Sequence, residues 1–208
     1  EVELQEGCSA LVLGLGGLAV YPSLVPDSQA LRTALQTIAH EWLHQYWFFS
    51  PLGQAYFSTA EMTTVNETAA EIAGRELGDM VYEQLGYELP QPPAPPTPAS
   101  DADSLTVTFD FAVEMRKTRL RGDELLDEGQ VEEAEAYMET RRRLFVEHGY
   151  GIRKLNQAYF AFHGTYAVSP ASSSPIAGQL EQVRGQAPDI GSFIRTVARF
   201  GSYAKLLN

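Results

Sequence analysis

The sequence predicts a mainly α-helical fold (mainly α, α+β) with a small strand region at the N-terminus. Apolar residues recur with the helical period over residues 28–47 and again over 63–85. Two further stretches, 105–127 and 131–148, are highly charged and have the composition of helices with solvated outer faces. The apolar, glycine-rich stretch 11–21 differs from these and indicates extended structure. We therefore expect helices to build most of the core.

Composition excludes one class of function and leaves others open. The chain of 208 residues is long enough for one large domain or two small ones. Its 44% hydrophobic and 20% charged residues are typical of a globular protein. The formal net charge of −12 lacks the basic surface that nucleic-acid binding requires, so we expect no nucleic-acid partner. The single cysteine, Cys8, rules out an internal disulfide.

The first half of the chain is predicted to hold the strand region and two helices. Residues 11–21 form either an edge strand that could pair with an extended peptide or, slightly favoured, a buried strand or strand–turn–strand. The first helix is expected to begin at Asp27 or Ser28, both typical N-cap residues, and to end at the turn 50–53. The second helix is expected over 63–85.

The second half is predicted to begin with a linker and continue as helices. The proline-rich segment 90–104 indicates an extended connector, with binding to a proline-recognising domain as the less favoured alternative. The two charged helices are joined by only 128–130, which predicts an antiparallel helical hairpin. Further helices are expected at 152–166, 176–184 and 190–200.

The stretch that organises these predictions is His40-Glu41-x-x-His44, in the second half of the first helix. Side chains four residues apart leave the same face of a helix, so both imidazoles can take adjacent corners of a tetrahedral zinc site. Glu41 lies one step around the helix, where its carboxylate can reach a metal-bound water without being a ligand. The alternative is a pair of buried, hydrogen-bonded histidines with no metal.

A catalytic zinc site needs a third protein ligand and one open position. Glu67 on the second helix is the best candidate for the third ligand. Glu71 follows one turn later on the same face and could hold the other nitrogen of a zinc histidine, while Asn66 could anchor the site. Ligation by Glu71 or Glu61 instead of Glu67 is the alternative.

Together, His40-Glu41-x-x-His44 and Asn66-Glu67-x-x-x-Glu71 resemble the motifs of the gluzincins, the thermolysin-like zinc metallopeptidases. The resemblance covers about residues 31–85 and implies a zincin-like core with His40, His44 and Glu67 as zinc ligands. Glu71 stands where thermolysin-like enzymes carry Asp, and the spacing to Glu67 is slightly longer than usual. The G-x-M-E-N exopeptidase motif is also missing from the sequence. The resemblance is therefore to a divergent branch and does not imply aminopeptidase specificity.

The resemblance also implies a mechanism. The zinc ion would activate a water molecule and polarise the scissile carbonyl, while Glu41 takes the proton of that water and delivers it to the leaving amine. A Tyr or His from a later helix would stabilise the oxyanion. The candidates are Tyr159, His163 and Tyr166, which share one face if 152–166 is a continuous helix. For each of them the alternative is a core aromatic residue.

These expectations divide the chain into a metal-binding core at 1–89, the linker 90–104, and a helical region at 105–208 that completes the active-site cleft in the same compact unit. The expected function is zinc-dependent hydrolysis of a peptide or protein substrate. One alternative is a non-catalytic, scaffolding zinc-binding domain that binds protein partners through the hairpin and the linker. Another is metal-dependent hydrolysis of a non-peptide bond.

The sequence gives less information on location. It contains no run of eighteen apolar residues, so we expect no membrane span within the chain. Because the chain begins at Glu1, we expect it to be a mature or truncated piece of a longer protein. An extracytoplasmic or membrane-tethered location is favoured over a cytoplasmic one.

Overall fold

The computed structural model describes residues 8–13, 17–20, 22–90 and 109–207. Within these ranges the chain forms eight α-helices, one short 3₁₀ helix and no strand, which confirms the prediction of a mainly α fold. No helix in the described ranges is both long and apolar enough to cross a membrane. The predicted linker falls almost entirely outside the described residues, which resume at Phe109.

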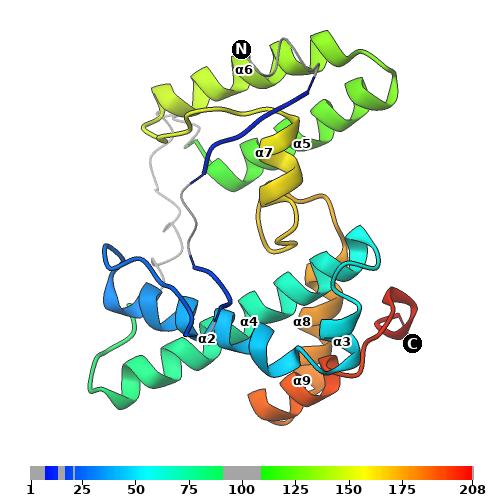
Figure 1. Ribbon diagram of the computed structural model, residues 1–208. Helices are drawn as coiled ribbons and strands as arrows, with labels where there is room; N and C mark the ends of the chain where they lie inside the picture. The colour runs from blue at the N-terminus through cyan, green and yellow to red at the C-terminus, as the bar shows by residue number, and fades with distance from the viewer. Residues whose placement is uncertain (1–7, 14–16, 21, 91–108, 208) are drawn as a thin grey trace, which may run out of the picture.

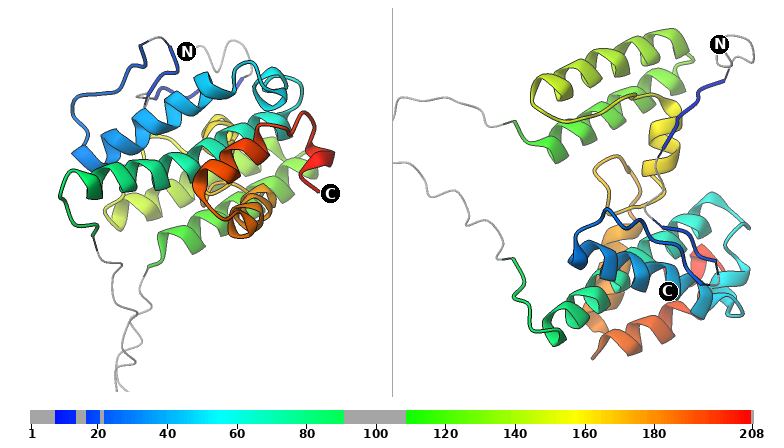
Figure 2. Two further views of the ribbon diagram at one scale, coloured as in Figure 1. Left: turned by 90° about the horizontal axis from the view of Figure 1, so that it is seen from below. Right: turned by 60° about the vertical axis from the view of Figure 1, so that its left-hand side comes forward.

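The described helices form two lobes joined by a narrow waist (Figures 1 and 2). The first lobe contains α2 (Leu31–Trp47), α3 (Pro51–Gln54), α4 (Ala60–Gln84), α8 (Ile176–Gln186), α9 (Ile190–Val197) and the 3₁₀ helix Tyr203–Lys205. The second lobe contains α5 (Phe111–Asp127), α6 (Val131–Glu147) and α7 (Gln157–His163). This grouping does not follow the chain, because α8 and α9 return from the second lobe to pack on α4.

The centre of the first lobe is the pairing of α2 with α4. Two glycines of α4 let the helix backbones come very close: an added Cβ at Gly78 would lie 2.5 Å from the Gln36 nitrogen, and one at Gly74 would lie 2.9 Å from the His40 nitrogen. Side chains at 67, 71, 74 and 78 follow one stripe of a helix. The same face of α4 therefore carries both the candidate ligand Glu67 and the closest packing against α2.

An apolar core packs against the helix pair α2 and α4. Leu43 and Trp47 of α2, Val65 of α4 and Phe193 of α9 are each fully buried. The Trp47 indole nitrogen also donates a hydrogen bond to the Ile194 carbonyl at 3.2 Å, so its polar group is not left unpaired. The C-terminal helices thus support the half of α2 that carries the histidines.

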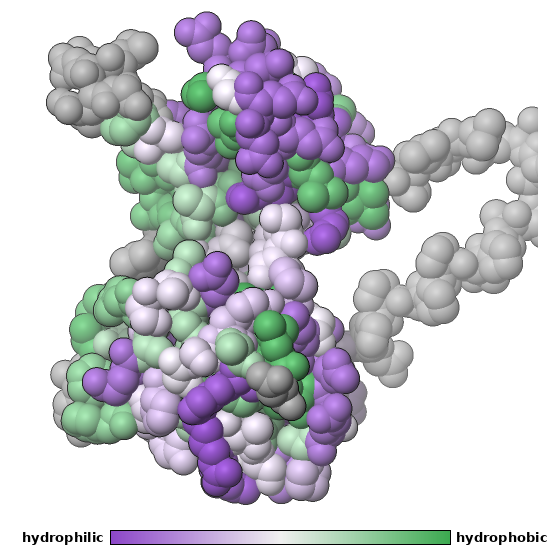
Figure 3. Space-filling view, turned by 90° about the vertical axis from the view of Figure 1, so that its right-hand side faces the viewer, coloured by the Kyte–Doolittle hydropathy of each residue, from purple (hydrophilic) through white to green (hydrophobic). Residues whose placement is uncertain are grey.

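The helical hairpin predicted from the charged stretches is confirmed. Helices α5 and α6 run antiparallel and meet at 128–130, where Gly129 adopts a φ of 75° (Figure 1). Arg141 of α6 bridges to Glu114 of α5 at 2.5 Å. Hydrophilic side chains cover much of this lobe on the face shown in Figure 3, as expected for a solvated pair of helices.

The prediction of an N-terminal strand is wrong for the residues of this segment that the structure describes. Residues 14–16 and Tyr21 lie outside the described ranges. They contain a single isolated antiparallel bridge between Leu18 and Leu24, closed by backbone hydrogen bonds of 2.9 and 3.1 Å. Pro22 lies between the two bridge residues and Pro26 soon follows, and proline has no N–H to extend a ladder. The pairing therefore stops at one bridge.

Two helix boundaries also differ from prediction. Helix α2 begins at Leu31 after Ala30, without a side-chain cap, so neither Asp27 nor Ser28 is its N-cap. Helix α7 covers only Gln157–His163 instead of 152–166. The Asn156 side chain caps its first turn by accepting a hydrogen bond from the Tyr159 nitrogen at 2.9 Å, which sets the late start, and the helix ends at the C-cap Gly164. The other expected helices are present with ends shifted by a few residues, except that α5 begins at Phe111 and the expected helical residues 105–108 lie outside the described ranges.

Candidate metal centre

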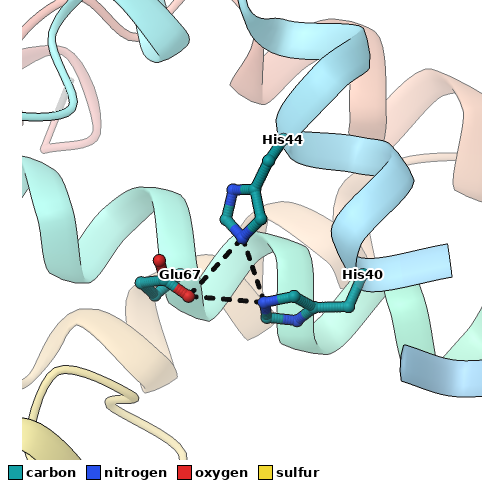
Figure 4. Close-up of side chains that lie close together, drawn as sticks. All are labelled: His40, His44 and Glu67. Carbon is teal, nitrogen blue, oxygen red and sulfur yellow. Dashed lines mark hydrogen bonds and ion pairs between the residues drawn. The ribbon is translucent and has the colours of Figure 1, made fainter. Parts of the chain in front are cut away.

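Helices α2 and α4 bring two imidazole nitrogens and one carboxylate oxygen together in the first lobe. His40 and His44 leave adjacent turns of α2 and point at Glu67 of α4 (Figure 4). Their Nε2 atoms lie 3.0 Å apart, and the Glu67 Oε2 atom lies 3.3 Å from that of His40 and 3.6 Å from that of His44. His40, His44 and Glu67 thus form a group that could hold a metal ion, and it is the group of three that sequence spacing predicted.

The second ring nitrogen of each histidine, Nδ1, also faces a partner. His44 Nδ1 lies 2.9 Å from Asn66 Oδ1, which fixes the imidazole with Nε2 toward the shared point. His40 Nδ1 is buried, and its partner is Glu71 Oε2 at 3.5 Å. Asn66 and Glu71 therefore lie at the outer ring nitrogens of His44 and His40.

Neither alternative to Glu67 as the third ligand places a carboxylate oxygen near the Nε2 atoms of both histidines. Glu61 is exposed at the start of α4 and is not part of the group of three. The Glu71 carboxylate faces the outer nitrogen of His40 instead of the point where the Nε2 atoms converge, and its Oε1 pairs with Arg75 at 2.6 Å. Among the described residues, Glu67 is the carboxylate that groups with the Nε2 atoms of both histidines.

The charges of this cluster support one another. Burial disfavours the charged form of His40, but hydrogen bonds and ion pairing with Glu67 and Glu71 outweigh it and raise the His40 pKa to about 9. Burial would also raise the pKa of Glu67, yet the two histidines and a tyrosine hydroxyl hold that pKa well below its usual value. Without a metal, the cluster therefore keeps a carboxylate beside an imidazolium.

Glu41 lies on the wall of the same cavity. Its side chain is largely buried, and this burial raises the pKa of its carboxyl, although the charges of His40 and His44 oppose the shift. The extended N-terminal segment passes directly over it, since an added Cβ at Gly17 would lie 2.4 Å from Glu41 Oε1. Only glycine fits at this position without moving the carboxylate.

The cavity has a volume of about 960 Å³. Besides the predicted ligand and supporting residues, its walls include Tyr166 beyond the end of α7 and the backbone segment 17–20. Three exposed phenylalanines also line it, Phe48 and Phe49 just after α2 and Phe57 in the loop after α3. The site is thus an open chamber, and the group that could hold a metal ion lies on one wall.

The three candidates for oxyanion stabilisation are separated by the structure. Because α7 ends at His163, Tyr166 is not on the same helical face as Tyr159 and His163. Tyr166 lines the cavity with its ring centroid 6.2 Å from that of His40, and burial together with nearby carboxylates raises its pKa. The rings of Tyr159 and His163 contact each other at a tilt of 41°, with centroids 4.2 Å apart, and neither residue lines the cavity.

Sequence reasoning missed one residue that touches the ligand group. The Tyr56 hydroxyl donates a hydrogen bond to Glu67 Oε1, and its ring lies edge-on to that of His44. Tyr56 follows α3 in an irregular loop, where no spacing rule connects it to Glu67. The glycines at 74 and 78 were also missed, although their four-residue spacing on the face of Glu67 was a usable signal.

Comparisons of this chain with models of protein families, with curated proteins and with solved structures each found no match. The functional argument therefore rests on the residues of the site and their geometry.

Proposed function

We propose that this chain is a zinc-dependent metallopeptidase of the gluzincin type, with a zincin-like helical core. The observation that carries the proposal is that the His40, His44 and Glu67 group and the Glu41 carboxylate share one cavity. A site built only to hold metal would have no use for Glu41, a carboxylate that neither belongs to this group nor orients one of its members. Hydrolysis by a metal-activated water requires a metal site with a proton-accepting group beside it, and this cavity brings such groups together.

The donor set supports zinc as the metal. Two imidazoles and one carboxylate are the ligands of many catalytic zinc sites. A tetrahedral ion with bonds of about 2.0–2.1 Å separates its ligand atoms by about 3.3–3.4 Å. The three distances here, 3.0, 3.3 and 3.6 Å, bracket that value. The side chains are thus already spaced for such an ion.

A catalytic site also needs an open position for water. Among the described residues, three side chains form the group that could hold the ion, and all three line the cavity. A fourth coordination position is thereby left for a molecule in the cavity. A zinc ion bound there would lower the pKa of a water molecule and polarise a substrate carbonyl. A structural site would normally close this position with a further protein ligand.

The roles of the chain's own residues follow from their places. Glu41 accepts the proton of the attacking water, and its raised pKa brings the carboxyl closer to the range in which a general base works well. Tyr166 keeps its hydroxyl proton at neutral pH, because burial and the nearby carboxylates raise its pKa, so it can donate to the oxyanion. Of the three residues predicted for this role, Tyr166 is the one we retain.

The cavity supports a peptide as the substrate. Its volume of about 960 Å³ lies at the upper end of the range for ligand sites and has room for several residues. The extended segment 17–20 forms one wall, where a peptide backbone could lie beside it. Internal cleavage is proposed because the sequence carries no exopeptidase motif.

The test is Glu41→Gln, assayed for both bound zinc and peptide hydrolysis. We expect the variant to keep about one zinc per chain and to lose hydrolysis by about 10²- to 10⁴-fold, the range for removal of a general base. Glu83→Gln, an exposed position near the end of α4, is the matched control and should behave as wild type. Equal activity in the Glu41→Gln variant would refute the hydrolase and leave the scaffolding alternative.

A further inference from the structure

The two oxygens of Glu67 have different partners. Oε2 faces the Nε2 atoms of His40 and His44 at 3.3 and 3.6 Å. Oε1 points away from them and accepts a hydrogen bond from the Tyr56 hydroxyl. The carboxylate is therefore held in one rotation, with a single oxygen directed at the point where the three ligand atoms converge.

Tyr56 is itself fixed from several sides. Its backbone nitrogen donates to the Gly53 carbonyl at 3.2 Å, and its own carbonyl accepts a hydrogen bond from Thr63 Oγ1 at 2.6 Å. The ring rests edge-on against the His44 ring at a centroid distance of 6.1 Å. Helix α3 and the first turn of α4 thus clamp the residue on both sides, so the hydroxyl is placed by the fold.

This arrangement matters because a carboxylate can bind a metal ion through one oxygen or through both. Binding through both oxygens would add a fourth protein bond, so that an ion that also holds a water molecule would become five-coordinate. We propose that Tyr56 is a positioning residue that restricts Glu67 to one metal-binding oxygen and so keeps the site four-coordinate, with one position for water. The inference rests on the proposed zinc site but not on any hydrolytic activity.

The geometry also separates Tyr56 from the oxyanion role. A phenol has one hydrogen to donate, and that of Tyr56 is used on Glu67 Oε1. The nearby carboxylate and burial raise the Tyr56 pKa, so the hydroxyl remains a donor at neutral pH. Tyr56 therefore acts on the ligand, and Tyr166 faces the substrate.

The test is Tyr56→Phe in the full chain loaded with Co²⁺ in place of zinc. Cobalt reports coordination number directly, since its visible absorption is several-fold stronger in four-coordinate than in five-coordinate sites. We expect the variant to show weaker visible bands than wild type, as Glu67 turns to bind through both oxygens. Its zinc affinity, measured by competition with a chelator, should fall by about 10- to 100-fold, as for other residues that orient ligands.

Tyr46→Phe is the matched control, because Tyr46 is half exposed on α2 and stacks on Trp42 away from the ligands. It should keep both the spectrum and the affinity of wild type. Wild-type bands and affinity in a folded Tyr56→Phe variant would overturn the inference, and so would a wild-type chain that binds no Co²⁺. If the variant spectrum changes as expected while wild type cleaves no peptide, the positioning role stands and the proposed peptidase function fails.

Discussion

His40 lies between the carboxylates of Glu67 and Glu71, one at each ring nitrogen. In a metal site these carboxylates serve different purposes, since one shares the metal and the other orients the imidazole. In the metal-free protein both of them instead stabilise a proton on His40, which raises its pKa from 6.5 to about 9. A metal ion bound at His40 would therefore compete with this proton.

The metal-free protein should consequently lose stability as the pH rises from about 6.5 to about 9. The folded pKa of His40 lies above its unfolded value, so its contribution is complete below pH 6.5 and disappears as the pH passes about 9. The Glu67 pKa is depressed, so its own contribution is present throughout this window. We expect the free energy of unfolding to fall by up to about 3 kcal/mol.

Urea denaturation of chelator-treated protein at a series of pH values would measure this change. A His40→Gln variant, which cannot gain the proton, should lack the pH dependence assigned to His40. The same slope in both proteins would contradict the interpretation.

Single residues also mark how far the sequence could predict the site. The four-residue spacing of His40 and His44 follows from helix geometry, and the face of α4 that carries Glu67 and Glu71 follows in the same way. Tyr56 could not be predicted, because its contact with Glu67 depends on the path of the loop after α3. Helical periodicity predicts partners within and between helices but gives no position for a loop side chain.

At the scale of elements, the site depends on how closely α2 and α4 approach. Gly74 lies against the backbone of His40, and Gly78 lies against that of Gln36 one turn before it. Helical periodicity predicted both helices with ends that differ by only a few residues. The extent of α7 was not predicted: Asn156 caps its start, and the helix ends at His163 before Gly164, which leaves Tyr166 beyond its C-terminal end. Local capping competes with periodicity in setting where a helix begins.

Gly78→Ala should test this close approach. The new Cβ would meet backbone atoms of Gln36 at 2.5 and 2.6 Å, which can be relieved only by moving the helices apart. We expect a loss of about 1–3 kcal/mol in the free energy of unfolding, as for other overpacked sites. Denaturant unfolding of the metal-free variant measures it directly.

Gly122→Ala on α5 is the control for helix propensity. Its Cβ would only touch Met138 at 3.9 Å, an ordinary contact, so the variant should gain up to about 1 kcal/mol. If Gly78→Ala were equally harmless, the packing of α2 on α4 would not be as close as the structure has it.

At the scale of the whole molecule, the chain passes from the first lobe to the second and back again (Figure 2). The return places α8 and α9 under α4, where Phe193 and Ile194 complete the core that supports Trp47. Helical periodicity indicated these late helices but could not assign them to a lobe, since amphipathic helices of similar length fit either one. The cavity consequently takes its walls from the N-terminal segment, from α2 to α4 and from the region after α7.

A bound metal ion would tie α2 to α4 across this fold and stabilise the folded state by mass action. The measurement that tests the central claim most directly is therefore metal analysis of the purified chain beside Glu67→Ala and Glu71→Ala variants. We expect about one zinc per wild-type chain, almost none with Glu67→Ala, and an affinity about 10- to 100-fold weaker with Glu71→Ala. A well-folded wild-type chain that takes up no stoichiometric metal when zinc is supplied would contradict the account.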